Sequence, residues 1–323
     1  MSDPFESYSD LDDLAEQLAS DDAGERRVAV MELADLGDPQ AIPLLARAMA
    51  DKDAGVRLQV ARALESYDGP AAAAVLVTAL TDPDKEVASA ASESAAELKD
   101  PASADPLFPL VEHTSPFVRA SALRALKELR RKESLKPALQ ALRDSDPQVR
   151  VQAVGVVGFL KLEEAVPALK SAAADPDPLV RRAAISALTF SHTQTATETI
   201  AKGLADSDWM VREIAAETLG SAHGEGAAAQ LLATLSDPFW QVRLKTIRSL
   251  GKLKHKPAIK GISEALGHAQ ANLRKEAAAA LGEIGDPSAK PALEAVADDP
   301  DPDVRKNIRW ALQQIAIKAA ASA

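Results

Sequence analysis

The chain has 323 residues, more than one hydrophobic core usually organises, so it holds either several domains or a repeated array. Hydrophobic residues make up 46% and charged residues 26%, as in ordinary soluble proteins, whereas aromatic residues make up only 3%. The absence of cysteine excludes disulfides, thiolate catalysis and cysteine-ligated metals. The net charge of -11 argues against general affinity for nucleic acid, because neutralising phosphates requires a basic surface.

The N-terminal segment is acidic and lacks the basic and apolar regions of a signal peptide. The longest apolar run, Ala71 to Leu80, is too short to span a bilayer. These features predict a cytoplasmic protein with no membrane partner.

The predicted elements begin with a polar helix over about 9–18, after which one pattern recurs every 31 residues without insertion or deletion. We call its reference points the register positions. A fixed short period is the signature of a stacked array. The register positions are Arg26, Arg57, Ala88, Arg119, Arg150, Arg181, Arg212, Arg243, Arg274 and Arg305.

Each register position lies in a predicted amphipathic helix. Apolar residues stand one residue before it and three, seven and ten residues after it, which forms one stripe on a helix of 3.6-residue period. Three residues after it stands Ala in seven of ten repeats, where a neighbouring helix could approach closely. Asp stands six residues before it in seven repeats, often followed by a second acid and Pro, as in Asp175-Pro-Asp-Pro178, and we expect this Asp to cap the helix.

A turn such as Gly285-Asp286-Pro287 ends this helix, and a shorter helix follows, as in Val166-Pro-Ala-Leu169. The sequence therefore predicts an all-α class, an α-solenoid of ten helical hairpins. It predicts a single continuous array over 1–323, closed by capping helices at about 9–18 and 304–317.

The Asp-Pro-Asp-Pro-x-Val-Arg, Ala-Leu-Gly and Gly-Asp-Pro elements resemble HEAT repeats, and most closely the short HEAT-like repeats of the phycobilisome (bilin) lyase class. This resemblance covers nearly the whole chain. It implies that the repeated Arg and Asp form a structural ladder. It leaves the activity open, because such repeats occur in bilin lyase subunits, assembly factors and bacterial adaptors.

Motifs for enzyme chemistry are missing from the sequence. It has no phosphate-binding loop, dinucleotide fingerprint or Gly-x-Ser-x-Gly, so we predict no catalytic residue and no cofactor. His113 and His268 replace the repeated Asp, whereas His192 and His223 share one column at a spacing that is loose for a metal. HEAT-repeat deoxyhypusine hydroxylases bind iron through His-Glu pairs. No His-Glu dipeptide occurs in this sequence, so we reject a resemblance to that enzyme class.

Two departures from the repeat are candidate partner-binding sites, because what all repeats share builds the fold. The first lies at the helix-start loops, where large apolar residues could form a contact surface or pack on their own helices. It comprises Phe117, Trp209, Met210, Phe239 and Trp240.

The second departure lies on the outward face of the register helices, which the HEAT resemblance places on the concave surface. There Val151 and Phe159 in the fifth repeat, with Phe190 in the sixth, are flanked by Arg124 and Arg248. Such a patch suits a partner helix or an extended peptide, unless neighbouring helices cover it.

The function that we predict is a non-catalytic cytoplasmic scaffold or adaptor that binds a protein partner along the concave face and the loop edge. One alternative is a tetrapyrrole lyase-like or cofactor-assembly subunit. A second is nucleic-acid binding through residues 242–275, which contain nine basic side chains and one acid, Glu264.

Overall fold

The computed structural model describes the backbone of residues 4–222 and 228–321. These residues form twenty α-helices joined by turns and short 3-10 segments, and the described ranges contain no β-strand. The all-α solenoid class is therefore confirmed. The chain divides into two compact units, Met1–Leu160 and Lys161–Ala323.

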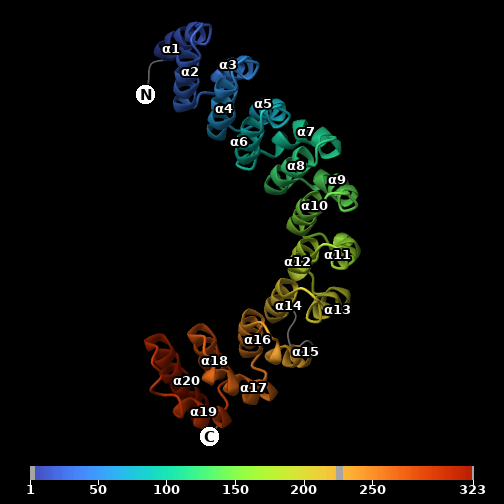
Figure 1. Ribbon diagram of the computed structural model, residues 1–323, viewed down its shortest axis with the longest axis vertical. Coiled ribbons are helices and arrows are strands. Elements are labelled where there is room, and N and C mark those ends of the chain that lie inside the picture. The colour runs from blue at the N-terminus through green and yellow to red at the C-terminus, as the bar shows by residue number, and fades with distance from the viewer. Residues whose placement is uncertain (1–3, 223–227, 322–323) are drawn as a thin grey trace. The chain divides into compact units, whose positions relative to one another are not determined.

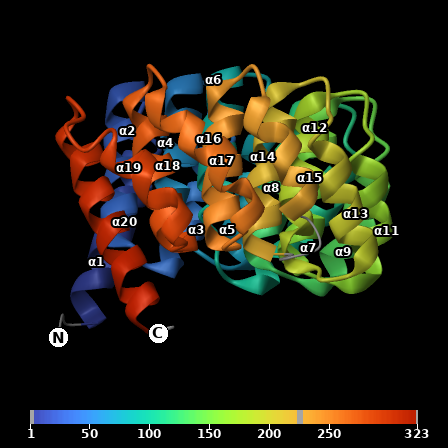
Figure 2. The ribbon, with the colours of Figure 1, turned by 90° about the horizontal axis from the view of Figure 1, so that it is seen from below.

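In the first unit, register helices alternate along the chain with partner helices, most of which are shorter. The register helices pack against one another in sequence order, and the shorter helices form a second layer (Figures 1 and 2). The register helices are α2 (Ala23–Leu36), α4 (Ala54–Ala63), α6 (Lys85–Ala95), α8 (Pro116–Leu129) and α10 (Pro147–Leu160). The others are α1 (Pro4–Gln17), α3 (Ile42–Ala48), α5 (Pro70–Leu80), α7 (Ala104–Leu107) and α9 (Leu135–Ala141).

The second unit repeats the same alternation, so the described helices make ten pairs in all. Its register helices are α12 (Pro178–Ala187), α14 (Trp209–Ala222), α16 (Trp240–Lys252), α18 (Ala271–Ile284) and α20 (Pro302–Ala321). Its shorter helices are α11 (Val166–Ala172), α13 (Gln194–Gly203), α15 (Ala228–Ala233), α17 (Ile259–Glu264) and α19 (Lys290–Glu294). None of the described helices is long and apolar enough to cross a membrane.

The apolar stripe of the register helices forms the core of each unit. In α8, for example, Val118, Ala122 and Leu126 are almost completely buried. The stripe predicted from the period is therefore correct. Helices this short are marginal in isolation, so each depends on the surface that it buries against its neighbours.

The residue that caps each register helix differs from our expectation. In the seven repeats that have Asp four residues before the register position, this second acid is the N-cap: Asp53, for example, accepts a hydrogen bond from the amide of Val56 at the start of α4. The first acid, Asp51, instead accepts a hydrogen bond from the amide of Asp53 and faces the preceding repeat. The second acid caps because it directly precedes the helix, where its carboxylate reaches the free amides of the first turn.

Register helices of the second unit lie in tight contact at glycines, eight residues after the register position. A Cβ atom placed on Gly251 of α16 would lie 2.8 Å from the Cα of Ala280 in α18, closer than atoms can pack. Gly282 meets Ala311 of α20 in the same way. The repeated Ala expected at a close approach is fully buried, as at Ala215 and Ala277, and a Cβ atom placed on Gly203 of α13 would lie 3.0 Å from that of Ala215.

Candidate functional site

The register arginines link each repeat to the next. In the first unit Arg57 donates through Nε and Nη2 to both carboxylate oxygens of Asp82, 25 residues later, at 2.7 and 3.0 Å. Its Nη1 donates to the carbonyl oxygens of Asp51 and Lys52 in its own loop. We call such a link an inter-repeat pair. Five more with the same bidentate geometry are Arg26–Asp51, Arg119–Asp144, Arg181–Asp206, Arg212–Asp237 and Arg274–Asp299.

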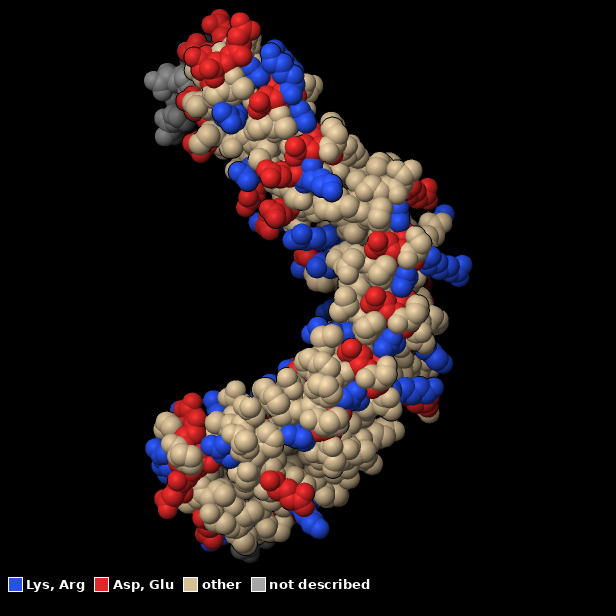
Figure 3. All heavy atoms as spheres, viewed as in Figure 1, with Lys and Arg blue, Asp and Glu red and all other residues tan. Residues whose placement is uncertain are grey.

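The inter-repeat pairs are less exposed than surface ion pairs. The side chains of Arg212 and Asp237 retain only 12% and 6% of their exposure. The pKa of Asp237 lies below its usual value, because hydrogen bonds from Arg212 and the amide of Phe239 outweigh the cost of burial. Bidentate geometry and burial both point to structural links. Figure 3 shows basic and acidic side chains lying next to each other on the visible face of each unit.

Histidine replaces the Asp of the inter-repeat pair at two positions. His268 lies with Nε2 2.7 Å from Nη2 of Arg243, while its Nδ1 accepts a hydrogen bond from the amide of Gln270. Burial, and then the charges of Arg243 and Arg274, lower the pKa of His268. His268 and His113 were expected to replace helix caps. They occupy instead the acceptor column of the inter-repeat pairs, because the first acid of each loop accepts from the preceding repeat and the second acid caps the helix.

The structure brings two of the loop-edge residues together in the second unit. The rings of Trp209 and Phe239, from consecutive repeats, stack with centroids 5.4 Å apart and planes 10° from parallel. The guanidinium of Arg212 lies over the ring of Phe239, 5.7 Å from its centroid. Phe239 nevertheless remains 41% exposed. This stack joins neighbouring repeats, so it is more than a staple within one helix.

Within the described part of the chain, the other loop-edge residues make no ring contact with this stack. Met210 and Trp240 are half-buried at the starts of α14 and α16, and the amide of Met210 donates to the N-cap Asp208. Phe117 lies in the first unit, at the start of α8, and is 43% exposed. The loop edge therefore offers exposed aromatic surface in both units.

The second candidate patch is divided between the two units. In the first unit Phe159 is 36% exposed near the end of α10, with the guanidinium of Arg130 4.8 Å from its ring centroid. Val151 is half-buried and Arg124 is exposed. In the second unit Phe190 is half-buried. That Phe159 and Phe190 form one patch stays a prediction.

Arg248, the remaining member of the predicted patch, makes a bidentate ion pair with Glu276 at 2.6 and 2.9 Å. It is therefore engaged within the unit. Of the nine basic residues in 242–275, five pair with acidic side chains, which weakens the basic surface available to phosphates. These five are Lys245, Arg248, Lys256, Arg274 and Lys275.

The histidine column that we weighed as a metal site is only partly described. His192 is exposed in the turn before α13, and His223 lies outside the described residues. Within the described residues, no group of three or more His, Asp and Glu side chains is arranged to hold a metal ion.

One relation escaped the sequence analysis although the sequence contains it. Every Asp that accepts an inter-repeat pair lies 25 residues after its Arg, so Ala88 corresponds to His113. This is the only one of the nine possible pairs that lacks both the Arg and the Asp. The 25-residue offset, read along both columns, would have identified it.

The comparisons with known proteins agree with this architecture. The HEAT-repeat family profile matches residues 11–96, 73–144, 135–220, 172–235 and 228–313, which together cover most of the chain. The chain therefore belongs to the HEAT-repeat family. No curated protein matches it in sequence.

Several solved structures resemble the chain. An engineered protein is 21% identical with a TM-score of 0.51, covering 95% of this chain and 99% of its own. YibA of Escherichia coli is 18% identical with a TM-score of 0.56, covering 92% and 98%. A Kap121p mutant is 13% identical with a TM-score of 0.57, and the match covers 95% of this chain but 41% of Kap121p. At these identities the likeness shows the fold alone.

Proposed function

We propose that the chain is a non-catalytic scaffold or adaptor that binds a protein partner along its helix-start loop edge and the outward face of its register helices. The observation that carries this proposal is the stack of Trp209 and Phe239. Aromatic side chains that remain exposed beside a cation are typical of the residues that dominate binding at protein interfaces. HEAT repeats, moreover, form a fold that proteins use for interaction surfaces.

The regular residues are excluded from this role by their contacts. The Arg and Asp columns link repeats, and the apolar stripes fill the core, so neither is free to contact a partner. The partner surface must then consist of the residues by which repeats differ. These include Phe117, Phe239 and Phe159, which remain exposed by 43%, 41% and 36%.

The test is the double substitution Trp209→Ala and Phe239→Ala, assayed by quantitative capture of partners from the native cell extract. We expect the captured partner to be lost, since truncating one central aromatic residue commonly costs about 2 kcal/mol of binding, roughly thirtyfold in affinity. The matched control is Ile317→Ala, which removes an apolar side chain, 53% exposed, near the end of α20. Unchanged capture by the double variant, with normal helix content, would contradict the loop-edge assignment.

The outward face has its own test. Phe159→Ala and Phe190→Ala together should abolish capture without lowering the helix content measured by circular dichroism.

The tetrapyrrole alternative predicts an absorbance shift on mixing with a bilin or haem. The nucleic-acid alternative predicts steeply salt-dependent retention of DNA or RNA.

A further inference from the structure

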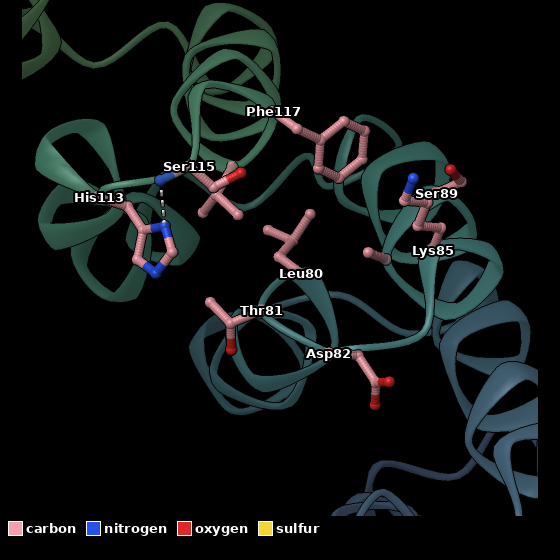
Figure 4. A pocket seen from close by; sticks show the side chains of 10 residues that line it. Leu80, Thr81, Asp82, Lys85, Ser89, His113, Ser115 and Phe117 are labelled. Atoms are coloured by element: carbon pink, nitrogen blue, oxygen red, sulfur yellow. Dashed lines mark hydrogen bonds between the residues drawn. The ribbon is translucent and has the colours of Figure 1, made fainter.

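One inter-repeat pair is absent from the first unit, and a cavity of about 400 Å³ lies in its place. Ala88 stands where the other register positions carry Arg, and it lines this cavity together with His113. The cavity also contacts the end of α5 and the starts of α6 and α8 (Figure 4). Asp82, Lys85, Ser115 and Phe117 also line it.

The other repeats show which groups a guanidinium would contact in this cavity. Every register Arg donates through Nη1 to the carbonyl six residues before it, and in most repeats also to the next carbonyl. The corresponding carbonyls beside Ala88 belong to Asp82 and Pro83. No donor in the described part of the chain reaches either oxygen. Both carbonyls therefore lack the cationic donor that the other repeats supply, and Asp82 lines the cavity.

The chain contains a complete version of this same site in the second unit. There Arg243 donates through Nη1 to the carbonyl of Asp237 at 2.8 Å, and its Nη2 lies 2.7 Å from Nε2 of His268. His113 has the orientation of His268, because its Nδ1 accepts a hydrogen bond from the amide two residues later, at 3.1 Å. The site at Ala88 is thus the His-containing pair without its arginine.

The surroundings of the cavity also suit a cation. The first unit has 17 Lys and Arg against 28 Asp and Glu, so it carries a net charge of -11, whereas the second unit is balanced at 20 against 20. An acidic unit attracts cationic ligands and excludes anionic ones. Phe117, exposed at the cavity edge, offers a ring on which a guanidinium can stack. Lys85 opposes these effects at one point of the lining.

We propose that this cavity binds an arginine side chain presented by a protein partner, whose guanidinium completes the missing inter-repeat pair. The proposal rests on the proposed function, of which it specifies one contact. Because Nδ1 of His113 accepts a hydrogen bond from the amide of Ser115, the one proton of the neutral imidazole lies on Nε2. Nε2 therefore cannot accept from the guanidinium as a carboxylate does, so this contact is weaker than the Arg–Asp pairs. A weaker pair suits an arginine that must also dissociate.

The test uses the full chain and the probe N-acetyl-Gly-Arg-Gly-amide, followed by NMR at the His113 ring and the Ser115 amide. We expect saturable shifts with this peptide, weaker shifts with the Lys analogue, and none with the neutral citrulline analogue, because only arginine supplies both the charge and the forked donors. Equal responses to the Arg and Lys peptides would overturn the proposal.

Two substitutions test the site in opposite directions. Ala88→Arg supplies the missing side chain, so it should abolish the saturable shifts and raise Tm. His113→Asp restores the acceptor found in other repeats, so it should tighten peptide binding several-fold. The matched control for the first is Ala74→Arg, which adds the same charge at an exposed position of α5 and should leave binding unchanged.

Retained peptide binding by a folded Ala88→Arg variant would overturn the site, and so would weakened binding by His113→Asp. The second variant decides the matter if the first does not fold. These measurements need no natural partner. A negative result therefore removes the arginine contact and leaves the loop-edge proposal to its own test.

Discussion

At the scale of single residues, the Arg–Asp pairs are more than weak surface contacts. Exposed ion pairs each contribute a few tenths of a kcal/mol to about 1 kcal/mol. The structure instead shows bidentate, largely buried pairs, such as Arg274–Asp299, whose side chains keep 13% and 5% of their exposure. Sequence spacing located these residues, but it could not show burial, which depends on how adjacent loops pack.

The His268 pair predicts a pH dependence of stability. The pKa of His268 is lowered in the folded chain, so between the folded and unfolded values the unfolded chain binds more protons. Stability should therefore fall as pH drops below about 6.5, the ordinary value for His, because protonated His268 faces Arg243 and Arg274.

His268→Asp is the variant that isolates this effect, measured by urea unfolding between pH 5 and pH 7.5. The folded-state pKa of the paired carboxylates is lowered as well, but their contribution is lost only at more acidic pH, near and below about 4. In this variant the free energy of unfolding should no longer decline between pH 7 and pH 5. An unchanged pH profile would show that His268 does not control it.

At the scale of helices, the apolar stripe and the hairpin order followed directly from the period, because every repeat carries the same spacing. The tight contacts between helices did not follow from the period. Glycines occupy the column eight residues after the register position in only four of the ten repeats, so they did not stand out from the pattern that most repeats share. Their role depends on which residue of the next helix faces them, which only packing determines.

Gly251→Ala tests the close contact. Alanine in a helix ordinarily stabilises it by about 1 kcal/mol relative to glycine. At position 251 the added Cβ would meet Ala280, and we expect overpacking to outweigh that gain, for a net loss of about 1–2 kcal/mol in urea unfolding. Gly155→Ala is the matched control, since its Cβ would lie an ordinary 3.4 Å from Lys127 Cδ. If both substitutions stabilise equally, α16 and α18 are not in tight contact.

At the scale of the whole molecule, regular and irregular positions have separate roles. The regular columns build the HEAT fold, and the sequence alone was sufficient to recognise them. The candidate sites were recognised less completely. The sequence indicated Trp209 and Phe239 but not their stacking, and it showed Ala88 and His113 as separate exceptions rather than one vacant pair.

The central claim, that the irregular loop edge binds a protein partner, is tested most directly by site-specific photo-crosslinking in the native cell. A benzophenone amino acid replaces Phe239 in one variant and Ile317 in the other; both native side chains are exposed. We predict a discrete crosslinked product from position 239 that disappears on Trp209→Ala, and none of it from position 317. The absence of any product at 239, or the same product from both positions, would contradict the account.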